Sequence, residues 1–348
     1  PTTGREGCPA PRPAGRDRKW SSQNVLEWFY SQDHSASTVQ AMQQSRSFGV
    51  FGAIVAMLAV GTGITVSAQL VDYPVCGAQA VRYLAATVIL VGALLVVRRP
   101  LPRPRGTDWL WLVGVAATGL VLFNVAVIRS VEHAEPAAVA ILISAVPLIL
   151  LIGESVRLRR RPSPQLLAGV VLVVVGAALV QGGGRTSVEG LAWAFVALVC
   201  EAAFTLLAVP VLGRLGAVGV SIHTCWMGAL MFGALALGVD GLGAIPTLHT
   251  GAILALAYLA VVQTAIAFSL WYSAVNILGA AVAGLFVGLM PVGAALSGLV
   301  PGLTTVTPAV IGGSILVGVG IAVGLSARLA PEPPESPEPS PRAATMEA

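Results

Sequence analysis

Charged side chains are scarce in this chain of 348 residues, since Asp, Glu, Lys and Arg together make up 10% of it. Soluble globular domains carry about 25% charged residues. Apolar residues make up 56% of the chain, and its mean hydropathy is +0.83. A soluble protein of this length could not hide so much apolar surface from water, so the composition indicates a chain embedded in a membrane.

Sequence motifs of metal centres, ATP-driven pumps and common hydrolases are also missing. The four cysteines lie far apart, with no CxxC and no Cys/His cluster, so neither a metal site nor a disulfide is predicted. No GxxxxGK[ST] motif is present for ATP, and neither HExxH nor GxSxG occurs. We therefore expect no enzyme activity, no catalytic residue, no metal and no cofactor.

What the chain does contain is a series of long apolar segments. About ten segments reach the roughly 20 residues that a helix needs to cross a bilayer. Each is apolar on all sides, which is typical of helices that face lipid and protein rather than water. The predicted spans are residues 48–69, 74–97, 109–129, 136–156, 164–182, 190–210, 218–239, 248–271, 279–300 and 307–327. The sequence thus predicts an all-α membrane protein.

The two ends of the chain depart from this pattern. Residues 1–46 are polar and irregular, and residues 328–348 are rich in proline and glutamate. Such compositions are typical of extended segments that form no packed core. We expect both ends to be disordered tails on the cytoplasmic side.

The second half of the chain repeats the first. At a fixed offset of 144 residues, segment 127–180 aligns without a gap with segment 271–324. The matched pairs include Val131 with Val275, Pro147 with Pro291, Pro164 with Pro308, Gly169 with Gly313, and Gly176 with Gly320. Proline bends helices and glycine lets them approach closely, so the repeated positions are those that shape a helical bundle. Two copies of one bundle are the usual design of a secondary transporter.

The positions of the basic residues predict how the two copies are oriented. With a cytoplasmic N-terminus, every Lys and Arg except Arg82, Arg129 and Arg185 falls in a cytoplasmic segment, as the positive-inside rule requires. Each copy holds five spans, an odd number, so residues 48–182 and 190–327 form inverted repeats. Contact with lipid headgroups explains the basic excess, so no nucleic-acid partner is expected.

Several stretches of both repeats resemble the EamA-type carriers of the drug/metabolite transporter superfamily. These stretches are residues 137–147 with Gly153 and Glu154, 169–180, 280–291 and 313–323. The resemblance covers residues 48–327 and implies ten helices, a central cavity and the movement of small metabolites or drugs, often outward. Gly298 occupies the position that matches Glu154, so the second half lacks this glutamate.

Two ionisable side chains lie deep within predicted spans, where a charge costs about 3 kcal/mol or more. Arg82 is in the second span and Glu201 in the sixth, at comparable depth, so a pair between them would lower the cost of burying each. In a functional interpretation, Glu201 takes up and releases a proton while Arg82 holds an anionic substrate group or gates Glu201. The alternative is a static ion pair that joins the two halves.

Other polar and aromatic residues are weaker candidates. Gln263 could hydrogen-bond a substrate or join two helices. Asn124, Trp271 and Tyr272 could line a cavity, although Trp and Tyr near span ends are more often interfacial anchors. His223 could titrate near neutral pH, or it could be an ordinary interfacial histidine.

Further features lie at span ends and at helix breaks. Glu154 opens the basic loop 157–161 and is expected to form a salt bridge at the inner surface, with a role in transport as the alternative. The charged cluster around Arg129 and His133 forms either an outer gate or a solvated turn. Pro147 and Pro291 interrupt the fourth and ninth spans at symmetric places, which frees backbone carbonyls that can meet a ligand or water in a cavity.

Together these features predict a secondary transporter of the cytoplasmic membrane that exports a small metabolite or drug by proton-coupled alternating access. An uptake carrier for a nucleotide-sugar or a phosphorylated metabolite is the alternative within transporters, and a membrane receptor or scaffold is the alternative outside them. The expected partners are a small-molecule substrate, the lipid bilayer and protons as the coupling ion. The sequence leaves open whether the chain acts as a monomer or as a homodimer.

Overall fold

The chain is mostly helical in the residues that the structure, a computed structural model, describes. These are residues 39–70, 73–239, 249–296 and 307–326. Most of the two predicted tails lies outside the described residues. The exception is residues 39–46, which were predicted to be disordered but form the start of helix α2, Val39–Ser67.

The helices follow one another with short connections. They are α2 Val39–Ser67, α3 Val75–Val96, α4 Asp108–Val115, α5 Phe123–His133, α6 Pro136–Ile143, α7 Val146–Leu158, α8 Pro164–Gln181, α9 Val188–Leu206, α10 Val209–Val239, α11 Thr250–Tyr258, α12 Ala267–Leu278, α13 Ala280–Gly284, α14 Leu289–Leu296 and α15 Pro308–Ser326. Shorter 3₁₀ segments are η1 Ala68–Leu70 and η4 Leu285–Gly288, and π-helical segments are η2 Ala116–Leu122 and η3 Leu259–Ile266.

Within the described part of the chain, nine helical stretches are long and apolar enough to cross a membrane. A tenth, shorter apolar stretch covers Ala280–Leu296 and corresponds to the predicted ninth span. The predicted all-α membrane fold with two five-helix repeats is therefore confirmed. Three spans are longer than expected: the third runs over Asp108–His133, the seventh over Val209–Gly238 and the eighth over Thr250–Leu278. The seventh contains a kink at Gly216, where the backbone is not helical, so its extra length lies before the predicted start at residue 218.

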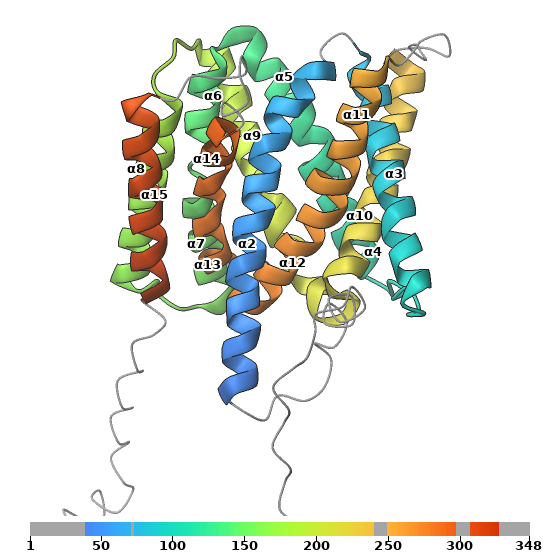
Figure 1. Cartoon of the computed structure of the whole chain (residues 1–348), viewed down its shortest axis with the longest axis horizontal. Helices are drawn as coiled ribbons and strands as arrows, with labels where there is room; N and C mark the ends of the chain where they lie inside the picture. The colour runs from blue at the N-terminus through green and yellow to red at the C-terminus, as the bar shows by residue number, and fades with distance from the viewer. Residues whose placement is uncertain (1–38, 71–72, 240–248, 297–306, 327–348) are drawn as a thin grey trace, which may run out of the picture. The chain divides into compact units, whose positions relative to one another are not determined.

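Glycines bring the last span of each repeat into backbone contact. Figure 1 shows α8 and α15 side by side. A Cβ added at Gly320 would lie 2.8 Å from the Gly169 carbonyl oxygen, and one added at Gly176 would lie 2.8 Å from the Gly313 carbonyl oxygen. Gly169 and Gly313 are matched in the repeat, as are Gly176 and Gly320, so the two contacts are related by the internal two-fold symmetry. The helices run antiparallel, as inverted repeats require.

The fourth and ninth spans are both broken next to their matched prolines. The fourth divides into α6 and α7, with Pro147 in the first turn of α7, and the ninth divides into α13, η4 and α14, which holds Pro291. The absent proline N–H explains why each helix is interrupted there. Both prolines are buried, and α7 packs against α13 of the other half, where Gly284 meets Leu150.

The carboxylate of Glu154 in α7 accepts a hydrogen bond from the Ala281 backbone N–H, at the start of α13. Glu154 is 5% exposed and lies away from the solvent. The salt bridge between Glu154 and the basic loop 157–161 stays a prediction, and the structure adds a contact that the sequence did not predict, with a buried N–H of the other half. Glu154 thus caps a broken helix across the interface between the repeats.

Candidate functional site

Two symmetric π-helical segments lie in the third and eighth spans. Segment η2 covers Ala116–Leu122, and η3 covers Leu259–Ile266, which is the same place in the repeat to within one residue. Each backbone hydrogen bond of a π-helix spans one more residue than in an α-helix. Such turns are rare, and they are frequent at functional sites. Their symmetric occurrence directs attention to the side chains that contact them.

On the side of η2, a short polar chain leads from α3 to the π-helical backbone. The Gln79 amide nitrogen donates to the Asn124 side-chain oxygen over 3.1 Å. Asn124 in turn donates to the Leu120 carbonyl within η2 over 2.6 Å. Asn124 thus makes a specific contact between two helices, and its predicted place in the lining of a cavity stays a prediction.

On the side of η3, Arg82 of α3 makes the corresponding connection. Its Nε donates to the Thr264 hydroxyl over 2.8 Å, and that hydroxyl donates to the Leu259 carbonyl over 2.8 Å. A second guanidinium nitrogen donates to the Gln79 side-chain oxygen over 3.3 Å. Arg82 also lies 5.1 Å from the centre of the Tyr83 ring. It is 8% exposed, so these contacts form away from solvent.

These bonds connect the two π-helical segments through two residues of one helix, Gln79 and Arg82. The segment η2 belongs to the first repeat and η3 to the second, while α3 packs on α10 and η3 of the second. Arg82 therefore acts as a link between the halves, and its guanidinium is already engaged by protein oxygens.

Replacing Arg82 with lysine tests the strength of this link. Lysine keeps the charge but cannot donate from Nε and Nη in the fixed geometry of the guanidinium. We expect Arg82→Lys to lower the free energy of unfolding by about 2 kcal/mol, measured by chemical unfolding in detergent micelles. The control is Arg129→Lys. The pair of Arg129 with Glu132 is exposed, so this variant should change the free energy of unfolding by less than about 0.5 kcal/mol. If the two variants lost the same free energy of unfolding, the role of Arg82 as a link between the halves would be contradicted.

The predicted ion pair between Arg82 and Glu201 is wrong. The four ion pairs found among the described residues do not include it, because the Arg82 donors are directed to Thr264 and Gln79. Sequence spacing could indicate a similar depth for the two residues, but it could not reveal the nearer oxygen atoms of α3 and η3.

Glu201 lies on the face of α9 that points into the protein. Ala197, Leu198 and Thr205 share this face at helical spacing and are buried, whereas Val199 on the opposite side is 44% exposed. Glu201 itself is half-buried. In the part of the chain that the structure describes, its carboxylate makes no hydrogen bond and no ion pair. A carboxylate at such depth without a protein partner is open to a proton or a ligand.

Aromatic side chains of α9 and α12 pack together one helical turn after Glu201. Tyr272 interacts electrostatically with Glu201. It packs on Phe204 with ring centres 5.2 Å apart, and Phe204 packs on Phe268 with ring centres 5.0 Å apart. Gly119 of η2 lies directly against the Phe204 ring, since a Cβ there would overlap it. Tyr83 of α3 also interacts electrostatically with Glu201. The carboxylate thus has aromatic neighbours from both halves.

Trp271 and Tyr272 are buried rather than interfacial. The indole N–H of Trp271 donates to the Thr205 hydroxyl over 3.1 Å, and the Tyr272 hydroxyl donates to the Phe204 carbonyl over 3.4 Å. Both bonds join α12 to the end of α9 that follows Glu201. The alternative that these residues anchor a span at the membrane surface is therefore wrong, since they are 4% and 0% exposed.

Two buried side-chain oxygens near this region have no hydrogen-bond partner among the described residues. They are the Thr224 hydroxyl oxygen and the Gln263 side-chain oxygen. Thr224 belongs to α10 and lies close to the Tyr272 hydroxyl, while Gln263 belongs to η3 and packs against Gly63 of α2. Buried polar atoms without a partner are rare and often meet water or a ligand. Gln263 thus remains a candidate ligand contact.

His223 has a structural role in this conformation. Its Nδ1 accepts a hydrogen bond from the Trp226 indole N–H over 3.1 Å, so Nε2 carries the proton and donates to the Pro102 carbonyl over 2.8 Å. Both ring nitrogens of a neutral imidazole are therefore occupied. His223 fastens the loop that follows α3 to α10, and nearby Arg214 adds a bond to the Arg103 carbonyl of the same loop.

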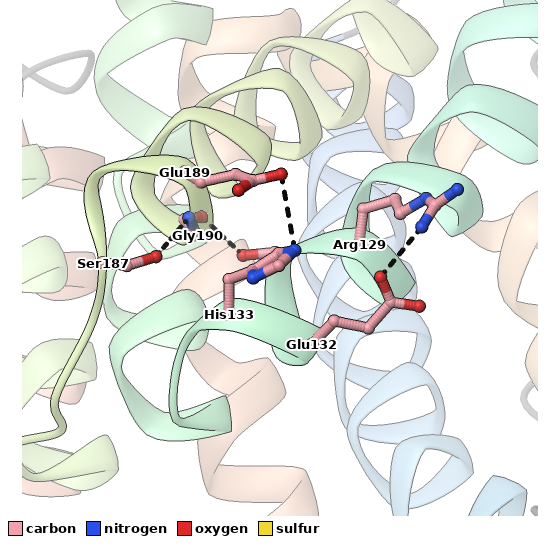
Figure 2. A network of polar contacts seen from close by, with 7 residues as sticks. Arg129, Glu132, His133, Ser187, Glu189 and Gly190 are labelled. Atoms are coloured by element: carbon pink, nitrogen blue, oxygen red, sulfur yellow. Dashed lines mark hydrogen bonds and ion pairs between the residues drawn. The ribbon is translucent and has the colours of Figure 1, made fainter.

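A polar network links the end of α5 to the start of α9, where the second repeat begins (Figure 2). Arg129 pairs with Glu132, and His133 lies 3.4 Å from Glu189 at the start of α9. The Ser187 hydroxyl accepts from the Gly190 N–H and caps α9. The charged side chains here are substantially exposed, which favours the solvated turn over an outer gate.

Sequence reasoning missed several residues of this site. Gln79 and Thr264 are uncharged polar residues within apolar spans, and they were not singled out from the sequence. Tyr83 and Phe204 were not singled out by the sequence analysis. A signal for Gln79 was available, since it lies three residues before Arg82 and therefore on the same helix face.

Known proteins resemble the chain along most of its length. Residues 47–181 and 188–325 each match the sequence profile of the EamA-like transporter family. "Uncharacterized transporter YetK" of Bacillus subtilis is 28% identical over 246 residues, which is 67% of this chain and 73% of that protein. "Probable terminal-alkyne amino-acid exporter" of Streptantibioticus cattleyicolor is 27% identical over 214 residues, 60% of this chain and 70% of that protein.

A solved crystal structure also has this fold. It superimposes with a TM-score of 0.68 and covers 82% of this chain and 99% of its own. Its sequence identity is 19%, so the likeness concerns the fold alone.

Proposed function

The chain belongs to the EamA-like transporter family, and we propose that it exports a small metabolite or drug across the cytoplasmic membrane in exchange for protons, by alternating access. The proposal places both termini in the cytoplasm, as the arginine distribution predicts. The membership itself makes it a multi-pass membrane transporter. Direction, coupling ion and substrate class belong to the proposal.

The observation that carries the proposal is the unpartnered carboxylate of Glu201. A transporter that exchanges protons for substrate needs a group that can hold either of them at the same place, deep between the halves. The titratable and charged groups near Glu201 are Tyr83, Tyr272 and Cys200, with Arg82 and Cys225 near the two tyrosines. None of them forms a hydrogen bond or ion pair with the carboxylate.

The symmetry of the fold supports alternating access. Inverted repeats can exchange their conformations, so that a site between them opens first to one side of the membrane and then to the other. The two π-helical segments and the two proline breaks occupy symmetric places and provide matched points at which the halves can bend.

Export is supported by a relative whose name describes an amino-acid exporter. Uptake of a nucleotide-sugar or a phosphorylated metabolite has less support, because such a substrate needs free cationic groups in the cavity. Arg82 is the cation that the sequence offered for this role, and its guanidinium is bonded to Thr264 and Gln79.

Comparison of metabolite pools tests the proposal. Compounds are measured inside and outside cells that lack the protein, overproduce it, or overproduce Glu201→Gln. We expect one compound class to leave the cell with the intact protein and not with the variant. Accumulation of a compound inside the overproducing cells would reverse the direction, and unchanged pools under all conditions would favour a receptor or scaffold.

A further inference from the structure

The charge of the substrate can be inferred from which of the two deep ionisable groups is free. Arg82 is buried, donates to two oxygens and faces the Tyr83 ring. An anionic substrate that used Arg82 would have to break the bonds to Thr264 and Gln79 and separate the link between the π-helical segments. Glu201 has no such bonds to break.

The surroundings of Glu201 favour an organic cation over a metal ion. The described residues contain no cluster of three or more His, Cys, Asp or Glu side chains that could hold a metal. Instead, Phe204 follows one helical turn after Glu201 and packs with Phe268 and Tyr272. Aromatic faces attract organic ammonium groups through their negative quadrupole and also accept an apolar body.

We propose that Glu201 binds the ammonium group of an amine substrate, with the Phe204, Phe268 and Tyr272 rings against its apolar part. This inference rests on the proposed function in taking the region between the halves as the substrate site. It adds that the substrate carries a positive charge at the place where the proton binds.

The buried Thr224 hydroxyl fits this arrangement. Its oxygen is buried and makes no hydrogen bond of ordinary length and angle within the described residues, and the Tyr272 hydroxyl is its polar neighbour. An ammonium group has three N–H donors, of which the carboxylate uses one or two. A hydroxyl oxygen without a partner near the same tyrosine is an acceptor for a remaining donor.

Binding and proton release are coupled in this arrangement. When the protonated carboxyl of Glu201 meets an alkylammonium ion, the carboxyl releases its proton to water and the carboxylate pairs with the ammonium. No other bond is made or broken. One proton therefore leaves for each positively charged substrate that binds to the protonated protein, which is the exchange that proton-driven export requires.

Three compounds with the same indole ring and the same two-carbon linker test the charge preference. Tryptamine is cationic, indole-3-propionate is anionic, and tryptophol is neutral. Binding to the purified full-length protein in detergent is measured by calorimetry, with proton release followed in weak buffer. We expect tryptamine to bind at least about tenfold more tightly than the other two, because a charged hydrogen bond contributes more than a neutral one. Tighter binding of indole-3-propionate, or no preference, would overturn the inference.

Variants then assign the preference to Glu201. Glu201→Gln should lose about tenfold or more in tryptamine affinity together with the proton release, whereas Glu189→Gln, an exposed carboxylate of the same helix, should lose neither. Unchanged tryptamine binding by Glu201→Gln would overturn the inference. The ranking of the three compounds by the unmodified protein requires no variant and remains decisive if Glu201→Gln fails to fold.

The inference and the proposed function can fail separately. Tryptamine binding through Glu201 without export of any compound would preserve the cation site and remove the transport proposal. Proton-dependent export of an acidic compound, with no binding of tryptamine, would preserve transport and remove the cation site.

Discussion

Glu201→Gln is expected to reduce export driven by a proton gradient about a hundredfold. Glutamine has nearly the same shape but carries no negative charge and takes up no proton near neutral pH. A hydrogen bond to a charged group is worth up to about 3 kcal/mol, which corresponds to roughly a hundredfold. The rate is measured in vesicles with an imposed pH gradient, using the compound that the metabolite comparison identifies.

Two matched variants sharpen this measurement. Glu201→Asp keeps a titratable carboxyl and should retain slower export with a changed pH dependence, because its carboxyl is one methylene farther from the bound group. Glu189→Gln removes an exposed carboxyl at the start of the same helix and should transport as the unmodified protein does. If Glu201→Gln moved the compound with the original pH dependence, Glu201 would not be the coupling group.

Gly320→Leu is expected to prevent α8 and α15 from packing. The position faces the backbone of α8, where an added Cβ would already lie 2.8 Å from both the Gly169 carbonyl oxygen and the Val173 nitrogen. Backbone atoms cannot turn aside as a flexible side chain can, so the two helices must separate. We expect the free energy of unfolding to fall by about 3 kcal/mol or more and the yield of folded protein to fall with it.

The control for this variant is Gly318→Leu, two residues away on the same helix. Gly318 is exposed, and an added Cβ there meets no atom within 4 Å. It should change the free energy of unfolding in detergent by less than about 0.5 kcal/mol. The folded yield should stay the same. Similar losses in the two variants would indicate that leucine disturbs the helix itself, and the proposed role of the close helix contact would be wrong.

The features of the fold that were predictable are those that depend on local sequence. Span length and hydropathy identified the membrane helices, and the matched prolines indicated where the fourth and ninth spans are broken. The glycines at 169 and 176 and their matches predicted close helix approach, because a small residue permits it wherever the partner lies. The pairing of α8 with α15 followed only from the three-dimensional structure.

The features that were not predictable depend on competition between partners in space. Arg82 and Glu201 have opposite charges at similar sequence depth, yet the Thr264 hydroxyl and the Gln79 amide lie closer to Arg82. Glu154 is a second case, since the N–H at the start of α13 that its carboxylate contacts belongs to the other half. The π-helical segments were also missed, because apolar residues within a span look alike whether the local turn is α-helical or π-helical.

The paired glycine contacts have a consequence for the history of the gene. Gly169 meets Gly320 and Gly176 meets Gly313, so each copy of the duplicated segment meets the other through the same two positions. An ancestral half-length chain with those positions could have made both contacts with a second molecule inserted in the opposite sense. After duplication and fusion, each of these positions packs against a different position of the other copy. A substitution in one copy must therefore fit its contact residue in the other copy, and the two copies cannot diverge independently at these positions.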